Sequence, residues 1–123
     1  KLVVIDVRGK SDEKELSELT LDVFNVGFQA RGIVATIEHR FYGQSLPLTS
    51  PTATDLLKFL TVQQAIADLV LFREYLIESY ELAGFKFVLM GCSYAGSLAA
   101  WARVQHPDLF LGAIASCPVI NLK

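Results

Sequence analysis

Ser93 lies in a sequence context that can turn a serine hydroxyl into a nucleophile. It follows the apolar run from Phe85 to Met90 and precedes a segment rich in small residues. A strand that turns sharply into a helix exposes the hydroxyl at the turn, and it directs the backbone N–H of the next residue, Tyr94, at a developing oxyanion. The pattern therefore predicts nucleophilic catalysis, with Ser93 as the nucleophile and the Tyr94 N–H as an oxyanion donor.

Such a turn crowds its own neighbours, so the residues two before and two after the serine must be small. Gly91 and Ala95 meet this need. The strict motif has glycine at the second position, so Ala95 is a departure, although Gly96 follows directly. The alternative interpretation is that Ser93 only occupies a small-residue turn that packs a helix on a sheet.

Four apolar runs predict the strands that must position this turn. They are Leu2 to Asp6, Ile33 to Ile37, Phe85 to Met90 and Leu111 to Ser116. The runs are apolar throughout rather than alternating, which is typical of parallel strands covered by helices on both faces. In such sheets ligands bind beyond the carboxyl ends of the strands, where Ser93 and the segment 38–43 both emerge. The predicted fold class is therefore α/β.

Three helical patterns separate these strands. Ser11 is a candidate cap for the first helix, which Gly32 ends and whose apolar face holds Leu16, Leu19, Val23 and Val26. Thr61 and Gln64 predict a capping box for the second, which Gly84 closes and which buries Val62, Ile66, Leu69, Phe72, Leu76 and Tyr80. The third runs from Tyr94 to Gln105, with Leu98 and Trp101 in the core. The segment with Pro47 and Pro51 is expected to be a loop.

Composition bounds the class of protein. At 123 residues with 52% hydrophobic content, the chain is one globular domain at most. Its net charge of −2 comes from dispersed charges, which gives no support to a nucleic-acid groove or an anionic membrane surface as partner. No run is long enough to span a membrane. Because the chain opens at Lys1, already inside a strand, we expect it to be a piece of a longer protein.

Cys92 and Cys117 have two interpretations. They could be neighbours at the ends of adjacent strands, or they could be two buried free thiols. The second is favoured, because free cysteine is so often buried.

Four separated strings together resemble one family, the prolyl carboxypeptidase and dipeptidyl peptidase 2 family of serine peptidases. They are Glu-His-Arg-Phe-Tyr-Gly-x-Ser-x-Pro at 38–47, a Leu, Gln, Ala and Asp pattern at 60–68, the turn around Ser93, and Gly-Ala-Ile-Ala-Ser-Cys-Pro-Val at 112–119. Two departures are visible at the site. The family usually has a glycine-rich, acidic turn at residues 7–10, so the second oxyanion donor is not assigned, and Cys92 stands where the family usually has glycine.

The resemblance implies part of an α/β-hydrolase catalytic domain that cleaves peptides next to proline and needs no cofactor or metal. It also implies that a helical insertion, the catalytic aspartate and the catalytic histidine lie beyond Lys123, so that the chain alone is inactive. A lysosomal, endosomal or secreted location follows from the resemblance only. Whether peptides are trimmed from the amino or the carboxyl end does not.

The histidines of this chain are not expected to supply the missing base. His106 is at the far end of the helix that begins beside Ser93, roughly 18 Å away at 1.5 Å per residue. His39 belongs to the Glu-His-Arg string, and with Arg40 it is expected to anchor the loop through hydrogen bonds; contact with substrate is the lesser alternative. Tyr42 either lines the cleft or packs. Asp6 ends a neighbouring strand, but an acid without a histidine completes no triad.

Two other functions stay open. The turn alone does not distinguish ester from amide substrates, so an esterase or lipase is one alternative. The other is a non-catalytic, truncated product that keeps the middle of the fold for interaction only.

Overall fold

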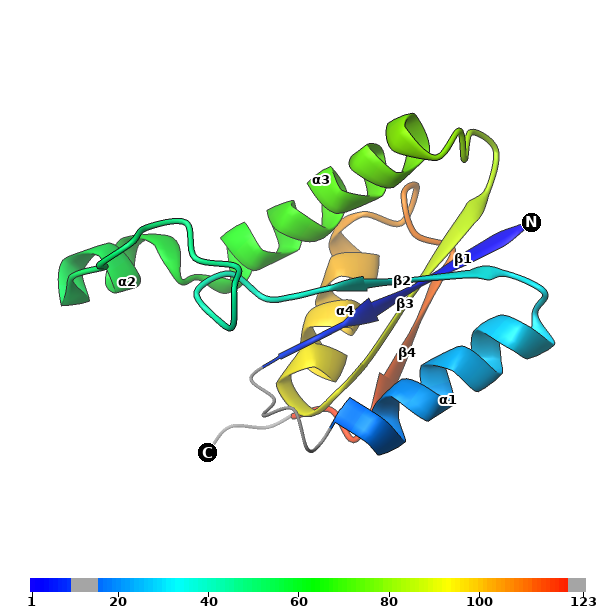
Figure 1. Ribbon diagram of the computed structural model, residues 1–123, viewed down its shortest axis with the longest axis horizontal. Helices are drawn as coiled ribbons and strands as arrows, with labels where there is room; N and C mark the ends of the chain where they lie inside the picture. Colours follow the sequence, from blue (N-terminus) through cyan, green and yellow to red (C-terminus); the bar gives the residue numbers. More distant parts are fainter. Residues whose placement is uncertain (10–15, 120–123) are drawn as a thin grey trace.

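The computed structural model describes residues 1–9 and 16–119, with residues 16–21 described by their backbone alone. Strands and helices alternate, with one extra helix between the second and third strands (Figure 1). The elements are β1 Leu2–Val7, α1 Leu16–Gln29, β2 Ile33–Ile37, α2 Ala53–Phe59, α3 Val62–Ser79, β3 Lys86–Cys92, α4 Ser93–Gln105 and β4 Gly112–Ser116. The prediction of an α/β chain is confirmed.

The four strands form one parallel sheet in the order β2-β1-β3-β4. The register aligns Asp6 with Thr36 on one side and with Met90 on the other, while Cys92 pairs with Ser116. All four strands therefore end at the same edge, and the chain that leaves β3 there is the one that carries Ser93.

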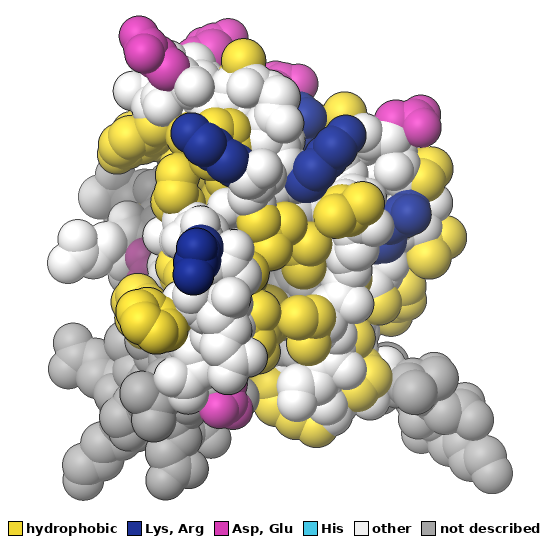
Figure 2. All heavy atoms as spheres, turned by 90° about the vertical axis from the view of Figure 1, so that its right-hand side faces the viewer, with side chains coloured by type: hydrophobic (Ala, Val, Ile, Leu, Met, Phe, Trp, Pro, Cys, Tyr) yellow, Lys and Arg dark blue, Asp and Glu magenta, His cyan; other side chains and the backbone are white. Residues whose placement is uncertain are grey.

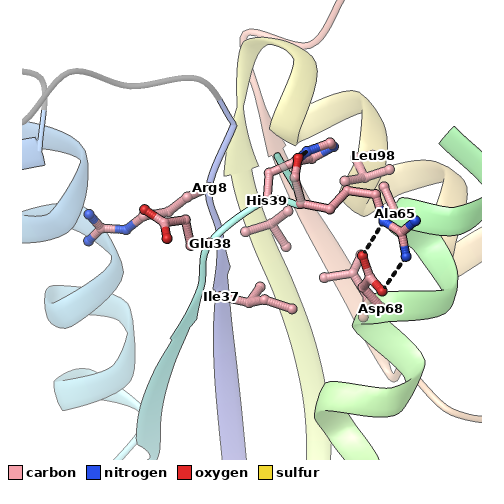
Figure 3. A pocket seen from close by; sticks show the side chains of 10 residues that line it. Arg8, Ile37, Glu38, His39, Ala65, Asp68 and Leu98 are labelled. Carbon is pink, nitrogen blue, oxygen red and sulfur yellow. Dashed lines mark hydrogen bonds and ion pairs between the residues drawn. The ribbon is translucent and has the colours of Figure 1, made fainter. Parts of the chain in front are cut away.

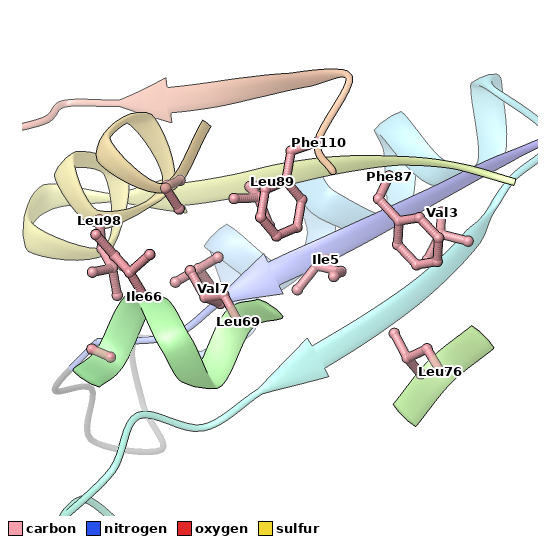
Figure 4. Packing of buried hydrophobic residues seen from close by; sticks show 14 of the residues in the cluster. Val3, Ile5, Val7, Ile66, Leu69, Leu76, Phe87, Leu89, Leu98 and Phe110 are labelled. Atoms are coloured by element: carbon pink, nitrogen blue, oxygen red, sulfur yellow. The ribbon is translucent and has the colours of Figure 1, made fainter. Parts of the chain in front are cut away.

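One face of the sheet packs against α3 and α4, and this interface is the main core (Figure 4). Side chains at alternate positions of β1 and β3 point to this face, because successive residues of a strand face opposite sides. Helix α3 contributes Ile66, Leu69 and Leu76 from one stripe at helical spacing. The fully buried members with the largest side chains are Phe87, Phe110, Ile5, Ile66, Leu69, Leu89, Leu98 and Val3.

The opposite face packs against α1 (Figure 1). Val4 and Met90 occupy the other alternate positions of β1 and β3, and they pack with Val23 of α1. Val26 and Val34 are half-buried beside them. Helices thus cover both faces, as the continuous apolar character of the strands predicted. The expected cap Ser11 lies outside the described residues, as do the side chains of Leu16 and Leu19.

Helix α2 corrects the expectation of a continuous loop between β2 and α3. Thr52 caps α2 in a complete capping box, in which its hydroxyl accepts from the Asp55 N–H and the Asp55 carboxylate accepts from the Thr52 N–H. The described side chains of α2 are all at least partly exposed. A short helix without a buried face gives little apolar periodicity, which is why the sequence pattern did not indicate it.

The ends of α3 differ from the prediction. Thr61 accepts from the Gln64 N–H at 3.3 Å, but Gln64 turns its side chain to Arg40 and to the Lys58 carbonyl, so only half of the predicted box forms. The helix ends at Ser79 rather than at Gly84. Tyr80 is the residue after that end and is 61% exposed, so its predicted burial is wrong.

Trp101 of α4 is 39% exposed, which corrects its assignment to the core, whereas Leu98 is buried as expected. The buried stripe of α4 consists of small residues and Leu98, and its members are Ala95, Leu98, Ala99 and Ala102. Trp101 lies at the margin of that stripe.

Figure 2 shows the side of the molecule at which the strands begin, opposite the edge that carries Ser93. Hydrophobic side chains separate the Lys and Arg side chains on this face, so the basic groups visible there form no continuous patch.

Candidate active site

Ser93 lies at the point where β3 turns into α4. Its φ angle is +54°, a left-handed conformation that residues with a side chain rarely adopt, and its side chain is exposed. Cys92, in extended conformation, is the N-cap of α4. Ser93 thus occupies a strained, solvent-facing turn at the N-terminus of a 13-residue helix, where the partial positive charge of the helix favours an anion.

The small residues around Ser93 are required by the backbone itself. A β-carbon on Gly91 would lie 2.6 Å from the Ala95 carbonyl oxygen, closer than real contacts allow. A β-carbon on Gly96 would lie 2.8 Å from the Ser116 carbonyl oxygen and 2.9 Å from that of Gly91. Ala95 itself is buried, and its methyl group is accommodated. The departure from glycine at residue 95 is therefore sterically harmless.

The turn after β1 lies beside the same helix end. A β-carbon on Gly9 would lie 3.6 Å from the Ala95 β-carbon and 3.8 Å from Cδ1 of the Tyr94 ring. Gly9, two residues after the end of β1, is therefore adjacent to the first turn of α4.

Cys92 and Cys117 form a disulfide, which corrects the preference for two free thiols. Cys92 pairs with Ser116 across β3 and β4, so the next residue, Cys117, falls within 5.4 Å of Cys92 between Cα atoms. On the other side of the helix end, Ser97 donates its hydroxyl to the Val119 carbonyl at 2.9 Å. The segment after β4 is thus tied to the Ser93 turn by one covalent bond and one hydrogen bond.

Arg40 anchors the loop after β2 to α3. Its guanidinium binds the two carboxylate oxygens of Asp68 at 2.6 and 2.7 Å, and it also donates to the Phe59 carbonyl at 2.8 Å and to the side chain of Gln64. This hydrogen bonding to Asp68 raises the pKa of Arg40 above its usual value, against the opposing effect of burial. The Arg40–Asp68 pair connects two strings of the sequence, 38–47 and 60–68, whose pairing the chain order did not reveal.

Glu38 closes the same loop. Its carboxylate accepts from the backbone N–H groups of Gln44 and Ser45 at 2.9 and 3.0 Å. Gly43 has φ of +54°, which glycine adopts without strain, and a β-carbon there would require the Glu38 carboxylate to move.

His39 lies buried between the loop and the first turn of α4. Its Nδ1 is 2.8 Å from the Arg40 carbonyl oxygen and its Nε2 is 3.2 Å from the Tyr94 hydroxyl. The expected anchoring through hydrogen bonds is therefore present, and the bond to Tyr94 was not foreseen. Tyr42, one of the candidate cleft residues, packs edge-on against the His39 ring with ring centroids 5.4 Å apart.

Tyr94 is 36% exposed, next to Ser93 at the start of α4. Burial of its phenol raises the pKa of Tyr94 above its ordinary value of 10.0, and the nearby Tyr42 adds to this shift. The Tyr94 phenol is therefore neutral, and able to donate a hydrogen bond, throughout the physiological pH range.

Two other sequence candidates have different places in the fold. Asp6 is buried and bonded to Arg8 Nε at 3.0 Å. His106 is the C-cap of α4, at the opposite end of that helix from Ser93. Within the described part of the chain, no three His, Cys, Asp or Glu side chains come together as a metal site, and no helix is long and apolar enough to cross a membrane.

A small pocket, open to solvent, lies where β1 and β2 end against α3 and α4 (Figure 3). Ile37, Leu98 and Ala65 contribute apolar side chains to it. The Asp68 carboxylate binds Arg40, which also lines the pocket. His39 lies on its wall, so the pocket is next to the Ser93 turn.

Comparison with known proteins identifies the family. Residues 2–123 match the family described as serine carboxypeptidase S28. The chain belongs to the S28 family. A Caenorhabditis elegans protein named "putative serine protease" is 44% identical over 90 residues, which are 73% of this chain and 16% of the relative. The lysosomal Pro-X carboxypeptidase of Bos taurus is 37% identical over 97 residues, 76% of this chain and 19% of the relative.

Other comparisons refine the S28 assignment. A protein of Arthroderma benhamiae named "probable extracellular serine carboxypeptidase" is 44% identical over 94 residues, 72% of this chain and 13% of that protein. The residues from Ser93 to Arg103 predict thymus-specific serine protease as the most similar member. The human protein of that name is 40% identical over 85 residues, 68% of this chain and 16% of its own length, below the nematode and fungal relatives, so this finer prediction is wrong.

A solved structure of a metagenome-derived lipolytic enzyme shares the fold. It superposes with a TM-score of 0.56 at 23% sequence identity, over 91% of this chain and 40% of that one. The chain thus has the parallel-sheet architecture of an α/β hydrolase, and it spans less than a fifth of the length of the S28 relatives described above.

Proposed function

We propose that Ser93 is the nucleophile of a serine exopeptidase that cleaves peptides next to proline. The observation that carries the proposal is the exposed Ser93 side chain on a left-handed turn at the N-terminus of α4, in a chain of the S28 family. The close packing of Gly91, Ala95 and Gly96 supports it. Because these residues are small, β3 and α4 approach each other closely enough to form the sharp turn at Ser93.

The proposed reaction is acyl transfer. Ser93 Oγ attacks the carbonyl carbon of the scissile bond and loses its proton to a base, while the carbonyl oxygen becomes an oxyanion that accepts from the Tyr94 N–H. The carbon–nitrogen bond then breaks, and the base returns the proton to the leaving amine. Water hydrolyses the resulting ester of Ser93 and releases the acid.

We propose that the base and its aspartate come from parts of the protein outside these residues. Both ring nitrogens of His39 are already engaged, and His106 is at the wrong end of α4. On this proposal the chain contributes the nucleophile, one oxyanion donor and the wall formed by the loop after β2. The rest of the catalytic domain completes the site.

The preference for proline is proposed from the relatives. One S28 relative is named for Pro-X cleavage, and the family is described as carboxypeptidases. A bond next to proline involves a ring with fixed φ, and proline has no N–H to offer as a donor, so extended binding alone does not select it. We also propose a lysosomal or secreted location, in keeping with the names of the bovine and fungal relatives.

The test uses the full-length protein at mildly acidic pH. A fluorophosphonate probe is expected to label the wild type on Ser93 and to leave Ser93→Ala unlabelled, while Ser97→Ala, one helical turn away, keeps its label. Absence of label on the wild-type protein would contradict the nucleophile assignment.

Substrate comparison then decides the chemistry. Peptides ending in Pro-X, peptides with proline second from the amino end, and a simple nitrophenyl ester are compared by kcat/KM. Turnover of the ester alone, without either peptide, would favour an esterase and overturn the peptidase proposal.

A further inference from the structure

The hydrogen-bond chemistry of His39 defines its tautomer. A carbonyl oxygen only accepts, so the 2.8 Å contact between Nδ1 and the Arg40 carbonyl requires the hydrogen on Nδ1. In the neutral ring Nε2 then carries a lone pair. The Tyr94 hydroxyl, 3.2 Å away, donates to that lone pair.

The acceptor that sets this tautomer is itself fixed. The Arg40 side chain holds Asp68 by two hydrogen bonds and the Phe59 carbonyl by a third, so the loop backbone at residue 40 is fastened to α3. His39 is only 6% exposed, and its ring packs edge-on against both Tyr42 and Tyr94, with ring centroids 5.4 and 5.5 Å apart. A continuous set of contacts therefore runs from α3 through Arg40 and His39 to Tyr94.

The last member of this set adjoins the strained turn. Ser93 has φ of +54°, a conformation that persists only when its surroundings hold it. Tyr94 follows directly, and its backbone N–H is the proposed oxyanion donor. Its side chain leaves the helix and reaches the loop after β2, which is a separate part of the fold. The His39–Tyr94 bond therefore restrains the turn from outside α4.

We propose that His39 is a positioning residue for catalysis. Through Nε2 it holds the Tyr94 side chain, and so it fixes the direction of the Tyr94 N–H and of the Ser93 hydroxyl. This inference rests on the proposed function, because it assigns His39 a part in the same reaction. In this role His39 acts through Tyr94 and does not accept the proton of Ser93.

The variants separate the two nitrogens of His39. Tyr94→Phe removes only the hydroxyl and keeps the ring and the backbone N–H. His39→Asn keeps a donor in the place of Nδ1 and loses the acceptor for Tyr94. His39→Gln places an amide oxygen where Nε2 lies and restores that acceptor. Tyr80→Phe removes a hydroxyl from an exposed tyrosine at the end of α3 and serves as the matched control.

The rate of Ser93 labelling by the fluorophosphonate is measured on the full-length variants, together with kcat and KM for the best peptide. Tyr94→Phe and His39→Asn are expected to lower the labelling rate and kcat by about two- to ten-fold, with KM unchanged, as expected for one lost hydrogen bond that acts in the transition state. The double variant is expected to fall no further, because both changes remove the same bond. His39→Gln is expected to recover much of the rate.

Several outcomes would overturn the proposal. Wild-type rates in Tyr94→Phe would show that His39 only anchors its own loop, with the nucleophile assignment intact if Ser93→Ala still abolishes labelling. Equal losses of labelling rate and kcat in His39→Gln and His39→Asn would also show that the bond from Tyr94 to Nε2 does not matter for the reaction. A loss of kcat/KM that is accompanied in each variant by a lower thermal midpoint would indicate that His39 has only a general packing role.

A readout that does not depend on activity tests the tautomer. In protein labelled with ¹⁵N in its imidazole rings, His39 is expected to show a protonated Nδ1 and an unprotonated Nε2, and Tyr94→Phe is expected to shift the Nε2 resonance only. A ring protonated on Nε2 and not on Nδ1 would overturn the inference even in an active enzyme. If the wild-type protein is not labelled at all on Ser93, the proposed function fails and this role for His39 fails with it.

Discussion

Gly91 faces the backbone of Ala95 so closely that a β-carbon on Gly91 would lie 2.6 Å from the Ala95 carbonyl oxygen. The strand before Ser93 and the helix after it thus touch through main-chain atoms. The geometry at Ser93 depends on the absence of a single methyl group.

Gly91→Ala is therefore expected to destabilise the protein by about 1–3 kcal/mol, as overpacking of a tight site does. It is also expected to lower the rate at which the fluorophosphonate labels Ser93. The control is Gly112→Ala in β4, where a β-carbon meets nothing within 4 Å. Chemical denaturation and probe labelling measure the two effects. A Gly91→Ala variant as stable and reactive as Gly112→Ala would contradict the close packing.

Removal of the Cys92–Cys117 disulfide is expected to lower the free energy of unfolding by about 3 kcal/mol, because a bridge over 25 residues restricts the unfolded chain. The double variant Cys92→Ser, Cys117→Ser is compared with the wild type by denaturation, in the presence and absence of a thiol reductant. The reductant is expected to destabilise the wild type only. Mass spectrometry of a non-reduced digest is expected to detect the peptides linked through Cys92 and Cys117, and their absence would rule the bridge out.

Arg40→Lys is expected to destabilise the protein by about 1–2 kcal/mol, because an ammonium group cannot reproduce the paired hydrogen bonds to Asp68 and the bond to the Phe59 carbonyl. Arg103→Lys is the matched control, since the half-buried Arg103 donates a hydrogen bond to the Leu111 carbonyl. Thermal unfolding of both variants measures the difference. Equal midpoints for the two would show that the Arg40 anchor contributes nothing.

The Tyr94 phenol is expected to titrate above its ordinary pKa of 10.0, chiefly because it is desolvated and secondarily because of Tyr42. A pKa raised on folding contributes stability that is fully present below the ordinary value and is lost as the pH rises through the folded value. The tyrosinate absorbance of the wild type minus that of Tyr94→Phe measures this titration. A transition at or below the ordinary value would show that the hydroxyl is solvated.

The sequence was sufficient for the parts of the fold that depend on continuous patterns. The apolar runs predicted four parallel strands, and the small residues around Ser93 predicted the sharp turn, because both features follow from local sterics and burial. The catalytic assignment of Ser93 and of the Tyr94 N–H stays a prediction until the labelling experiment is done.

Features that depend on which segments meet in space were missed. The strand register that aligns Cys92 with Ser116 brings the two cysteines together. The residues around each cysteine do not determine this register. The contacts of His39 with Tyr94 and of Arg40 with Asp68 join residues far apart in the chain. Burial of Trp101 was overestimated because the small residues of α4 already complete its packing on the sheet.

The Cys92–Cys117 bridge links the Ser93 turn to a segment that the ribosome makes 25 residues later. The disulfide can form only after β4 has been synthesised and has paired with β3, and only in the presence of an oxidant for thiols. Polypeptide made in a reducing cytosol would carry the serine on an unfastened turn, whereas export to an oxidising compartment would fasten it. The route of biosynthesis and the geometry of the Ser93 turn are thereby coupled through one covalent bond.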